Sequence, residues 1–281
     1  MVRRSAGPAG EAREADSSAA DRSRPAPARD EATRLDVALA ERGLARSRSQ
    51  AAELIAAGRV WVDGVVAGKS GARVGADAEL TVEGADPYVS RAAQKLITGL
   101  DEFGVAPAGR LALDLGASTG GFTQVLLERS ARAVIALDVG HGQLVESLRD
   151  DPRVVVVEGC NARDLTRASL AAVAGTDESP TLIVGDLSFI SLTLILPAIA
   201  RIAAQHAELI LLIKPQFEVG RHGIRDGIVT DPKLADDAVR RVIACAEGLG
   251  FTNRDVVPSP VTGEHGNREF LAYFCKEASE T

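Results

Sequence analysis

The sequence lacks any long hydrophobic run. No apolar stretch approaches the roughly 18 to 20 residues that a helix needs to cross a bilayer, and the start, Met-Val-Arg-Arg-Ser, leads into charge and proline instead of a secretory signal. The cysteines, Cys160, Cys245 and Cys275, are far apart and show no C-x-x-C spacing. We therefore expect a cytoplasmic protein with reduced cysteines, no membrane partner and no metal.

The sequence also lacks an overall excess of basic residues, although basic and acidic residues are unevenly distributed along the chain. The formal net charge of −7 argues, taken alone, against a nucleic-acid-binding protein. Residues 33–70 nevertheless hold six basic and four acidic residues, so a weakly basic part is joined to an acidic one. Residues 1–32 have almost no large apolar side chain, which predicts a disordered tail. A second, short tail is expected at residues 277–281.

Residues 33–83 predict a small α+β domain. An amphipathic helix is expected over residues 34–44, and a second helix follows, with Ser47 or Ser49 as its cap. An Asp-Gly turn between β-branched runs then predicts a hairpin. This arrangement would gather arginines on one face, although an ordinary solvated helix surface would show the same charge spacing.

After a linker at 84–89, residues 90–276 predict a doubly wound, mostly parallel, Rossmann-like α/β sheet, because apolar strands alternate with helices. The expected strands are residues 111–115, 133–138, 154–157, 181–186, 209–214, 251–257 and 269–275. The expected helices are residues 90–103, capped by Ser90, then 122–129, 142–149, 191–204 and 231–249. Ligands of such sheets bind at the carboxyl ends of the strands.

The stretch from Leu111 to Phe122 combines a buried strand, a glycine-rich turn and a helix, which is typical of a nucleoside-binding site. A dinucleotide site would need G-x-G-x-x-G, and the second glycine of that pattern is missing here. S-adenosylmethionine has no pyrophosphate to hold, so it suits the turn better, although other nucleotide-binding folds stay open. The candidate cofactor-binding residues are Asp114, Gly116, Ser118, Gly120, Phe122 and Asp138, with Asn161 and Asp164 facing the adenine.

Four charged residues form a second candidate set. Asp186 and Lys214 each end an apolar strand, whereas Lys95 lies in the helix before the first strand and Glu269 near the start of the last. Taken singly, each is more simply explained as a surface charge. Together they suit methylation of a ribose hydroxyl, because a neutral amine is needed to remove the proton and carboxylates are needed to orient the amines.

The turn after the fourth predicted strand bears on the acceptor atom. Enzymes that methylate exocyclic amines typically carry an Asn/Asp-Pro-Pro-aromatic turn there, whereas residues 186–189 read Asp-Leu-Ser-Phe. The absence of both prolines favours an oxygen acceptor over an amine.

The N-terminal elements Arg-Leu-Asp, Gly-Leu-Ala-Arg-Ser-Arg, Gly-Arg-Val and Val-Asp-Gly resemble the αL-type RNA-binding domain first described in a ribosomal protein. The resemblance implies binding to structured RNA through Arg46, Arg48 and Arg59. Arg34 and Lys69 complete the candidate RNA-binding set.

Four further motifs, at residues 114–122, 185–191, 214–218 and 266–270, resemble the TlyA family of ribosomal RNA methyltransferases, and the resemblance runs from about residue 33 to 276. It implies S-adenosylmethionine-dependent 2′-O-methylation of cytidine, with ribosomal RNA or ribosomal subunits as partner. It also implies that the four charged residues match the tetrad of heat-shock-type (FtsJ-like) ribose methyltransferases, with the lysine at 214 as proton acceptor.

Three alternative functions have to be considered. The βα alternation disfavours a pseudouridine synthase, which can carry the same RNA-binding module. An RNA-binding, ribosome-associated protein without catalysis would need no tetrad. Relatives are often called haemolysins, so a membrane-active protein is the third alternative, which the missing signal and missing spanning segment disfavour.

Overall fold

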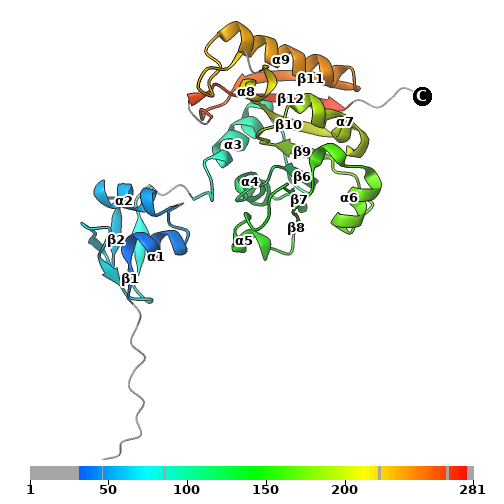
Figure 1. Cartoon of the computed structure of the whole chain (residues 1–281). Coiled ribbons are helices and arrows are strands. Elements are labelled where there is room, and N and C mark those ends of the chain that lie inside the picture. Colours follow the sequence, from blue (N-terminus) through cyan, green and yellow to red (C-terminus); the bar gives the residue numbers. More distant parts are fainter. Residues whose placement is uncertain (1–31, 46, 85–86, 221–222, 264–265, 277–281) are drawn as a thin grey trace, which may run out of the picture.

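The computed structural model describes residues 32–45, 47–84, 87–220, 223–263 and 266–276 (Figure 1). The predicted tails at residues 1–32 and 277–281 therefore lie outside the described residues, except for Ala32. Arg46, one of the candidate RNA-binding residues, lies outside them as well.

The small N-terminal domain is α+β, as predicted. Its elements are β1 (Thr33–Arg34), α1 (Leu35–Glu41), α2 (Arg48–Ala56), β2 (Val60–Val62), β3 (Val65–Val66), β4 (Arg73–Val74) and β5 (Leu80–Val82). Strands β3, β2 and β5 form one antiparallel sheet, and β1 pairs with β4. The Ser47 hydroxyl caps α2 by accepting a hydrogen bond from the Gln50 N–H at 3.2 Å. Leu35, Leu39 and Ile55 fill the core of this domain.

The larger domain is built on a seven-stranded sheet in the order β11-β12-β10-β9-β6-β7-β8. The strands are β6 (Leu111–Leu115), β7 (Ala133–Leu137), β8 (Val154–Val157), β9 (Leu182–Gly185), β10 (Glu208–Ile213), β11 (Phe251–Pro258) and β12 (Phe270–Lys276). The five strands from β10 to β8 run parallel, and β12 pairs antiparallel with both β10 and β11. The doubly wound, mostly parallel sheet is thus confirmed.

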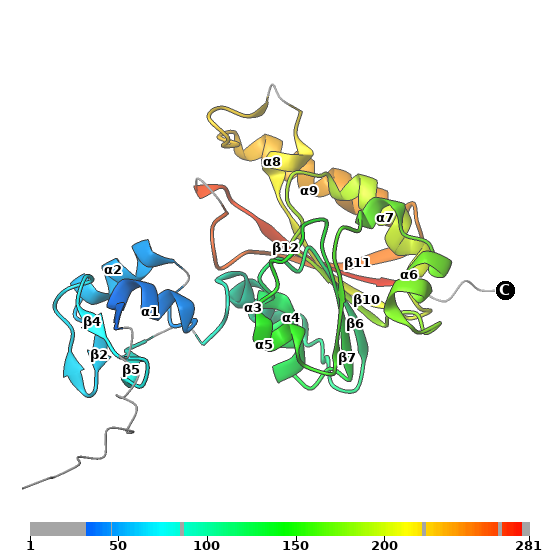
Figure 2. The same ribbon diagram turned by 60° about the horizontal axis from the view of Figure 1, so that its bottom comes forward.

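Helices cover both faces of this sheet (Figure 2). One face packs against α3 (Ala92–Phe103), α4 (Gly121–Glu128) and α5 (Glu146–Arg149). The other packs against α6 (Arg167–Ala174), α7 (Leu192–Ile202) and α9 (Pro232–Glu247), while the short α8 (Pro215–Glu218) follows β10 directly. From β6 the chain builds one half of the sheet through β7 and β8, and it then crosses over to β9 on the other side of β6. Ligands of open parallel sheets bind at such a switch point, here between the neighbouring strands β6 and β9.

Three local predictions were wrong. The helix expected over residues 142–149 is reduced to α5, because the chain first turns through Gly142, whose φ is 65°. Helix α6 was missed, since only Leu170 and Ala174 of its eight residues are buried and the apolar pattern is weak. Ser90 does not cap α3, which begins after Arg91 without a side-chain cap.

Candidate active site

Two strand ends meet at the centre of the sheet. Gly116 follows β6 with a φ of 81°, and a Cβ atom at this position would lie 3.2 Å from the carbonyl oxygen of Asp186, which follows β9. A side chain here would therefore strain the backbone and crowd its neighbour, so glycine lets the two turns approach each other. Asp186 lies at the ligand-binding edge of the sheet because it directly follows β9.

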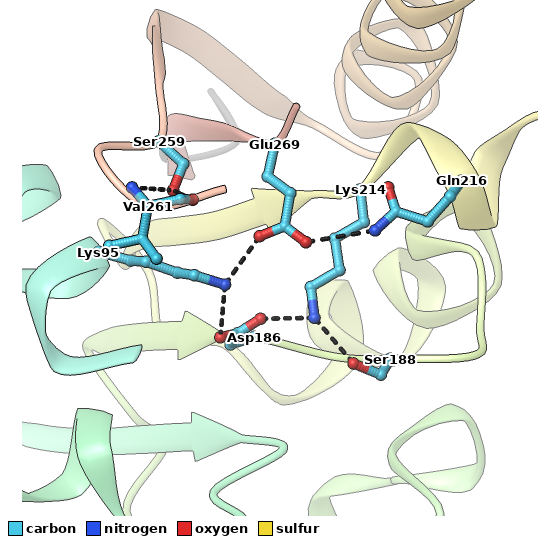
Figure 3. Close-up of polar contacts among 8 residues, drawn as sticks. All are labelled: Lys95, Asp186, Ser188, Lys214, Gln216, Ser259, Val261 and Glu269. Carbon is cyan, nitrogen blue, oxygen red and sulfur yellow. Dashed lines mark hydrogen bonds and ion pairs between the residues drawn. The ribbon is translucent and has the colours of Figure 1, made fainter. Parts of the chain in front are cut away.

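Lys95, Asp186, Lys214 and Glu269, called the tetrad below, form one chain of ion pairs (Figure 3). The Lys95 Nζ lies 2.7 Å from Glu269 Oε2 and 3.3 Å from Asp186 Oδ2. The Lys214 Nζ lies 2.7 Å from Asp186 Oδ1 and donates a hydrogen bond to the Ser188 hydroxyl at 2.8 Å. Asp186 thus joins the two lysines.

The tetrad is largely shielded from solvent. The exposed fractions of its side chains are 9% for Lys95, 9% for Lys214, 13% for Asp186 and 2% for Glu269. Two cations and two carboxylates balance in formal charge, which makes their burial tolerable as a set. Because a low-dielectric setting strengthens each pairing, the four side chains are held in one geometry.

Two side chains of α8 connect it to neighbouring segments of the site. Gln216 lies at the start of α8 and donates its Nε2–H to Glu269 Oε1 at 3.2 Å. Glu218 accepts hydrogen bonds from the Ser191 hydroxyl at 2.5 Å and from the Leu192 N–H at 2.7 Å. These bonds tie the turn after β10 to the loop after β9. Burial raises the pKa of Glu218 above its ordinary value, against the lowering effect of the bonds that it accepts.

Two cavities share a wall at this edge. The first, of about 470 Å³, is lined by the whole tetrad with Phe122, Gln216 and Gly263 among others, and is called the tetrad cavity below. The second, of about 530 Å³, is lined by Leu137, Asp138, Asn161 and Phe189 among others, and is called the Asp138 cavity. Residues lining both cavities are Gly116, Ser118, Asp186 and Ser188.

Asp138 is well placed to bind a polar ligand. Its Oδ2 accepts a hydrogen bond from the Ser118 N–H at 2.8 Å and its Oδ1 accepts one from the Gly140 N–H at 2.7 Å. Each carboxylate oxygen keeps acceptor capacity for a ligand hydroxyl. Asn161 also lines the Asp138 cavity, while its side-chain oxygen accepts a hydrogen bond from the Arg163 N–H at 3.1 Å.

Three predicted cofactor-binding residues line neither cavity. Asp114 is fully buried and accepts a hydrogen bond from the Thr123 hydroxyl at 2.7 Å, and burial raises its pKa to about 7. Asp164 is exposed and lies 3.5 Å from Arg163. Gly120 has a φ of 104° and faces Leu144 and Leu148, so it serves packing. The structure gives these three no ligand contact surface at either cavity.

Sequence reasoning missed Ser188, Gln216 and Glu218. Each lies within four residues of a predicted tetrad member and inside a quoted motif, so motif membership was the available signal. Their partners lie far away in sequence, as the separation of 53 positions from Gln216 to Glu269 illustrates. Only the folded chain reveals such pairings.

The candidate RNA-binding residues separate into two groups. Arg34 and Arg48 are exposed and both pair with Asp36, at 2.9 and 3.3 Å, and Lys69 is exposed beside a surface hollow. The Arg59 guanidinium instead donates to the carbonyl oxygens of Glu83 and Gly84, at 2.9 and 2.6 Å. Its bonds indicate a structural role within the domain.

Comparison with known proteins adds the family context. The FtsJ-like methyltransferase family matches residues 88–276 and the S4 domain matches residues 33–80. A Mycobacterium tuberculosis protein named 16S/23S rRNA (cytidine-2′-O)-methyltransferase TlyA is 49% identical over 243 residues, 85% of this chain and 88% of that protein.

Other relatives carry a different name. Hemolysin A of Brachyspira hyodysenteriae is 41% identical over 86% of this chain and 99% of its own length. A solved Streptococcus thermophilus structure, whose name also contains the word hemolysin, is 39% identical with a TM-score of 0.69, covering 88% of this chain and 90% of its own. In the part of this chain that the structure describes, no helix is both long and apolar enough to cross a membrane.

Proposed function

Because the chain belongs to the TlyA family of ribosomal RNA 2′-O-methyltransferases, we propose that it transfers the methyl group of S-adenosylmethionine to the 2′-oxygen of a cytidine in ribosomal RNA. The observation that carries this proposal is the tetrad, linked by ion pairs at the wall between two cavities. One cavity suits a nucleoside cofactor and the other suits a ribose with a removable proton.

The Asp138 cavity fits the cofactor. Asp138 offers acceptors for ribose hydroxyls, Asn161 lies where an adenine edge would be read, and Leu137 adds apolar wall. The turn at Gly116 and Ser118 reaches both cavities with little side-chain bulk, leaving room for the amino-acid part. S-adenosylmethionine would supply an electrophilic methyl group on a sulfonium sulfur.

The tetrad cavity suits the acceptor ribose. Lys95 lies between two carboxylates, Glu269 and Asp186, whereas Lys214 faces only one. Lys214 is therefore our candidate for the group that takes the proton of the 2′-hydroxyl as the oxygen–methyl bond forms and the methyl–sulfur bond breaks. Asp186 orients both amines, and Glu269 holds Lys95. Fixed positioning of the oxygen in line with the methyl group supplies much of the remaining acceleration.

The N-terminal S4 domain would supply affinity for ribosomal RNA. Arg34, Arg48 and Lys69 are exposed and can reach phosphates, which position a nucleic acid without reading its sequence. Since ribosomes are the source of such RNA, we expect the protein to act in the cytoplasm.

A direct experiment maps the modified atom. Purified protein is incubated with labelled S-adenosylmethionine and separate ribosomal subunits, and the RNA is digested to nucleosides for mass spectrometry. We expect label in 2′-O-methylcytidine. Label in base-methylated nucleosides, or binding of RNA without any label transfer by folded protein, would reject the proposed reaction.

A further inference from the structure

The two lysines of the tetrad have different polar neighbours. Lys95 Nζ faces two carboxylates, Glu269 at 2.7 Å and Asp186 at 3.3 Å. Lys214 Nζ faces one carboxylate, Asp186 at 2.7 Å, and one neutral acceptor, the Ser188 hydroxyl oxygen at 2.8 Å. A proton acceptor must have its lone pair aimed at the proton, so the partners of Lys214 decide where that lone pair points.

The number of N–H groups on a neutral amine indicates where its lone pair points. A neutral amine has two N–H groups and one lone pair in a tetrahedral arrangement. The Ser188 oxygen accepts one N–H. If the second N–H turns toward Asp186 Oδ1, which lies 2.7 Å away as an ion pair, the lone pair takes the remaining direction. Among the residues that the structure describes, no third hydrogen-bond acceptor lies within reach of Lys214 Nζ; the ring of Phe217 has its centroid 5.9 Å away. The remaining position is open to a ligand of the tetrad cavity, which Lys214 lines.

We propose that Ser188 is a positioning residue, whose hydroxyl oxygen accepts one N–H of neutral Lys214 and thereby aims the lone pair at the ribose hydroxyl. This inference rests on the proposed function, because it presupposes that Lys214 receives the proton. Ser188 and Asp186 would orient the Lys214 amine together, Ser188 as a neutral group and Asp186 as a charged one. A second carboxylate in its place would favour the charged form of an amine more strongly than a neutral hydroxyl does.

The loop that carries Ser188 is fixed at both ends. Asp186 follows β9 and is paired with both lysines, and Ser191 and Leu192 are bound to Glu218. Between them Phe189 adopts a φ of 63°, a left-handed conformation that sharpens the turn. Ser188 is itself exposed and lines both cavities, so it stands where the acceptor ribose and the cofactor would meet.

Removal of the Ser188 hydroxyl should change the pH–rate profile in two ways. Donation from the Lys214 ammonium to Ser188 favours the charged form, so in Ser188→Ala the amine loses its proton more readily and the acidic limb of the profile moves to lower pH. At the same time the lone pair is less well aimed, and the plateau rate falls by about fivefold, the loss expected from one hydrogen bond of about 1 kcal/mol. A packing role would lower the plateau without moving the limb.

Other titrating groups surround Lys214. Asp186 pairs with it, Lys95 and Glu269 follow in the chain of ion pairs, Glu218 lies on α8, and Asp114 interacts electrostatically with Asp186. All are present in wild type and variant alike. The difference between the two profiles therefore isolates the effect of the Ser188 hydroxyl.

The experiment measures single-turnover methyl transfer to ribosomal subunits from pH 5.5 to 9.5 for wild type, Ser188→Ala and Ser188→Thr, with S-adenosylhomocysteine affinity and thermal melting as controls. We expect Ser188→Ala to show the lower plateau and shifted limb, and Ser188→Thr, which keeps a hydroxyl, to restore both. An unchanged Ser188→Ala profile, or a lower plateau that threonine does not restore, overturns the inference while wild-type transfer keeps the proposed function. A wild type without any transfer overturns both.

Discussion

Two clusters of ion pairs in this chain differ in how deeply their side chains are buried. In the tetrad, no side chain is more than 13% exposed. In the N-terminal domain, the Asp36 side chain is 7% exposed, but its partners Arg34 and Arg48 are 46% and 62% exposed. The two guanidinium groups hold the pKa of Asp36 down at about 2. The tetrad side chains are held in one buried geometry, whereas the exposed ion pairs of Arg34 and Arg48 are open to screening by salt.

The largest effect should come from breaking the buried cluster at its shared member. Asp186→Asn removes the carboxylate that links both lysines, and the loss of both buried ion pairs should lower the single-turnover rate by roughly 10³-fold. Unpaired buried cations should also lower the melting temperature. Rapid-quench transfer assays and thermal melts measure both. A rate within tenfold of wild type would separate the tetrad from the chemistry.

A smaller effect should follow from breaking the exposed cluster. Arg34→Ala combined with Arg48→Ala should weaken binding to ribosomal RNA by about tenfold or more and lower the salt dependence of the affinity by roughly two phosphate contacts. The transfer rate at saturating RNA should stay close to wild type. Filter binding at several salt concentrations tests this, with Arg132→Ala, an exposed arginine of the larger domain, as the matched control. An unchanged salt slope would contradict the proposed RNA contact.

Asp114 sharpens the comparison, because it is a buried carboxylate with no cation beside it among the described residues. Its pKa rises from an ordinary 3.8 to about 7, so the native state binds more protons than the unfolded state between these values. The free energy of unfolding should therefore fall as pH rises through this range and level off above it. Asp36 titrates below the range and does not interfere.

Asp114→Asn should remove that fall. Urea unfolding at pH 5 and pH 8 should show a loss of roughly 2 kcal/mol in wild type that the variant lacks. Equal pH dependence in both proteins would mean that Asp114 is already ionised in the native state.

Glu218 offers the smallest expected effect, as a buried carboxylate held by neutral donors. Glu218→Gln keeps an acceptor for the Leu192 N–H and weakens both bonds, but it also removes the buried charge whose desolvation raises the pKa of Glu218, so the free energy of unfolding should change by less than about 1 kcal/mol. Urea unfolding at pH 7 measures this. If Glu218→Gln lost as much stability as Asp186→Asn, burial of a carboxylate alone, and not its pairing with cations, would explain the stability lost in Asp186→Asn.

The sequence predicted the scaffold of the larger domain and the ends of two central strands. Apolar runs before Asp186 and Lys214 located them at the carboxyl edge, because period and flanking residues are local properties. The sequence grouped Lys95 and Glu269 in one candidate set, but their contact, between residues 174 positions apart, is not a local property and is seen only in the folded chain. Asp114 illustrates the limit, since its position after a run of apolar residues indicated a ligand contact, whereas its side chain turns inward to Thr123.

The buried tetrad is proposed to carry methyl transfer to the ribose of ribosomal RNA. The most direct measurement is label transfer from S-adenosylmethionine to ribosomal subunits by wild type, Lys214→Ala and Lys233→Ala, the last being an exposed lysine on α9 that serves as control. We expect 2′-O-methylcytidine from wild type and Lys233→Ala, and at most about a thousandth of that rate from folded Lys214→Ala. Undiminished transfer by Lys214→Ala would contradict the account.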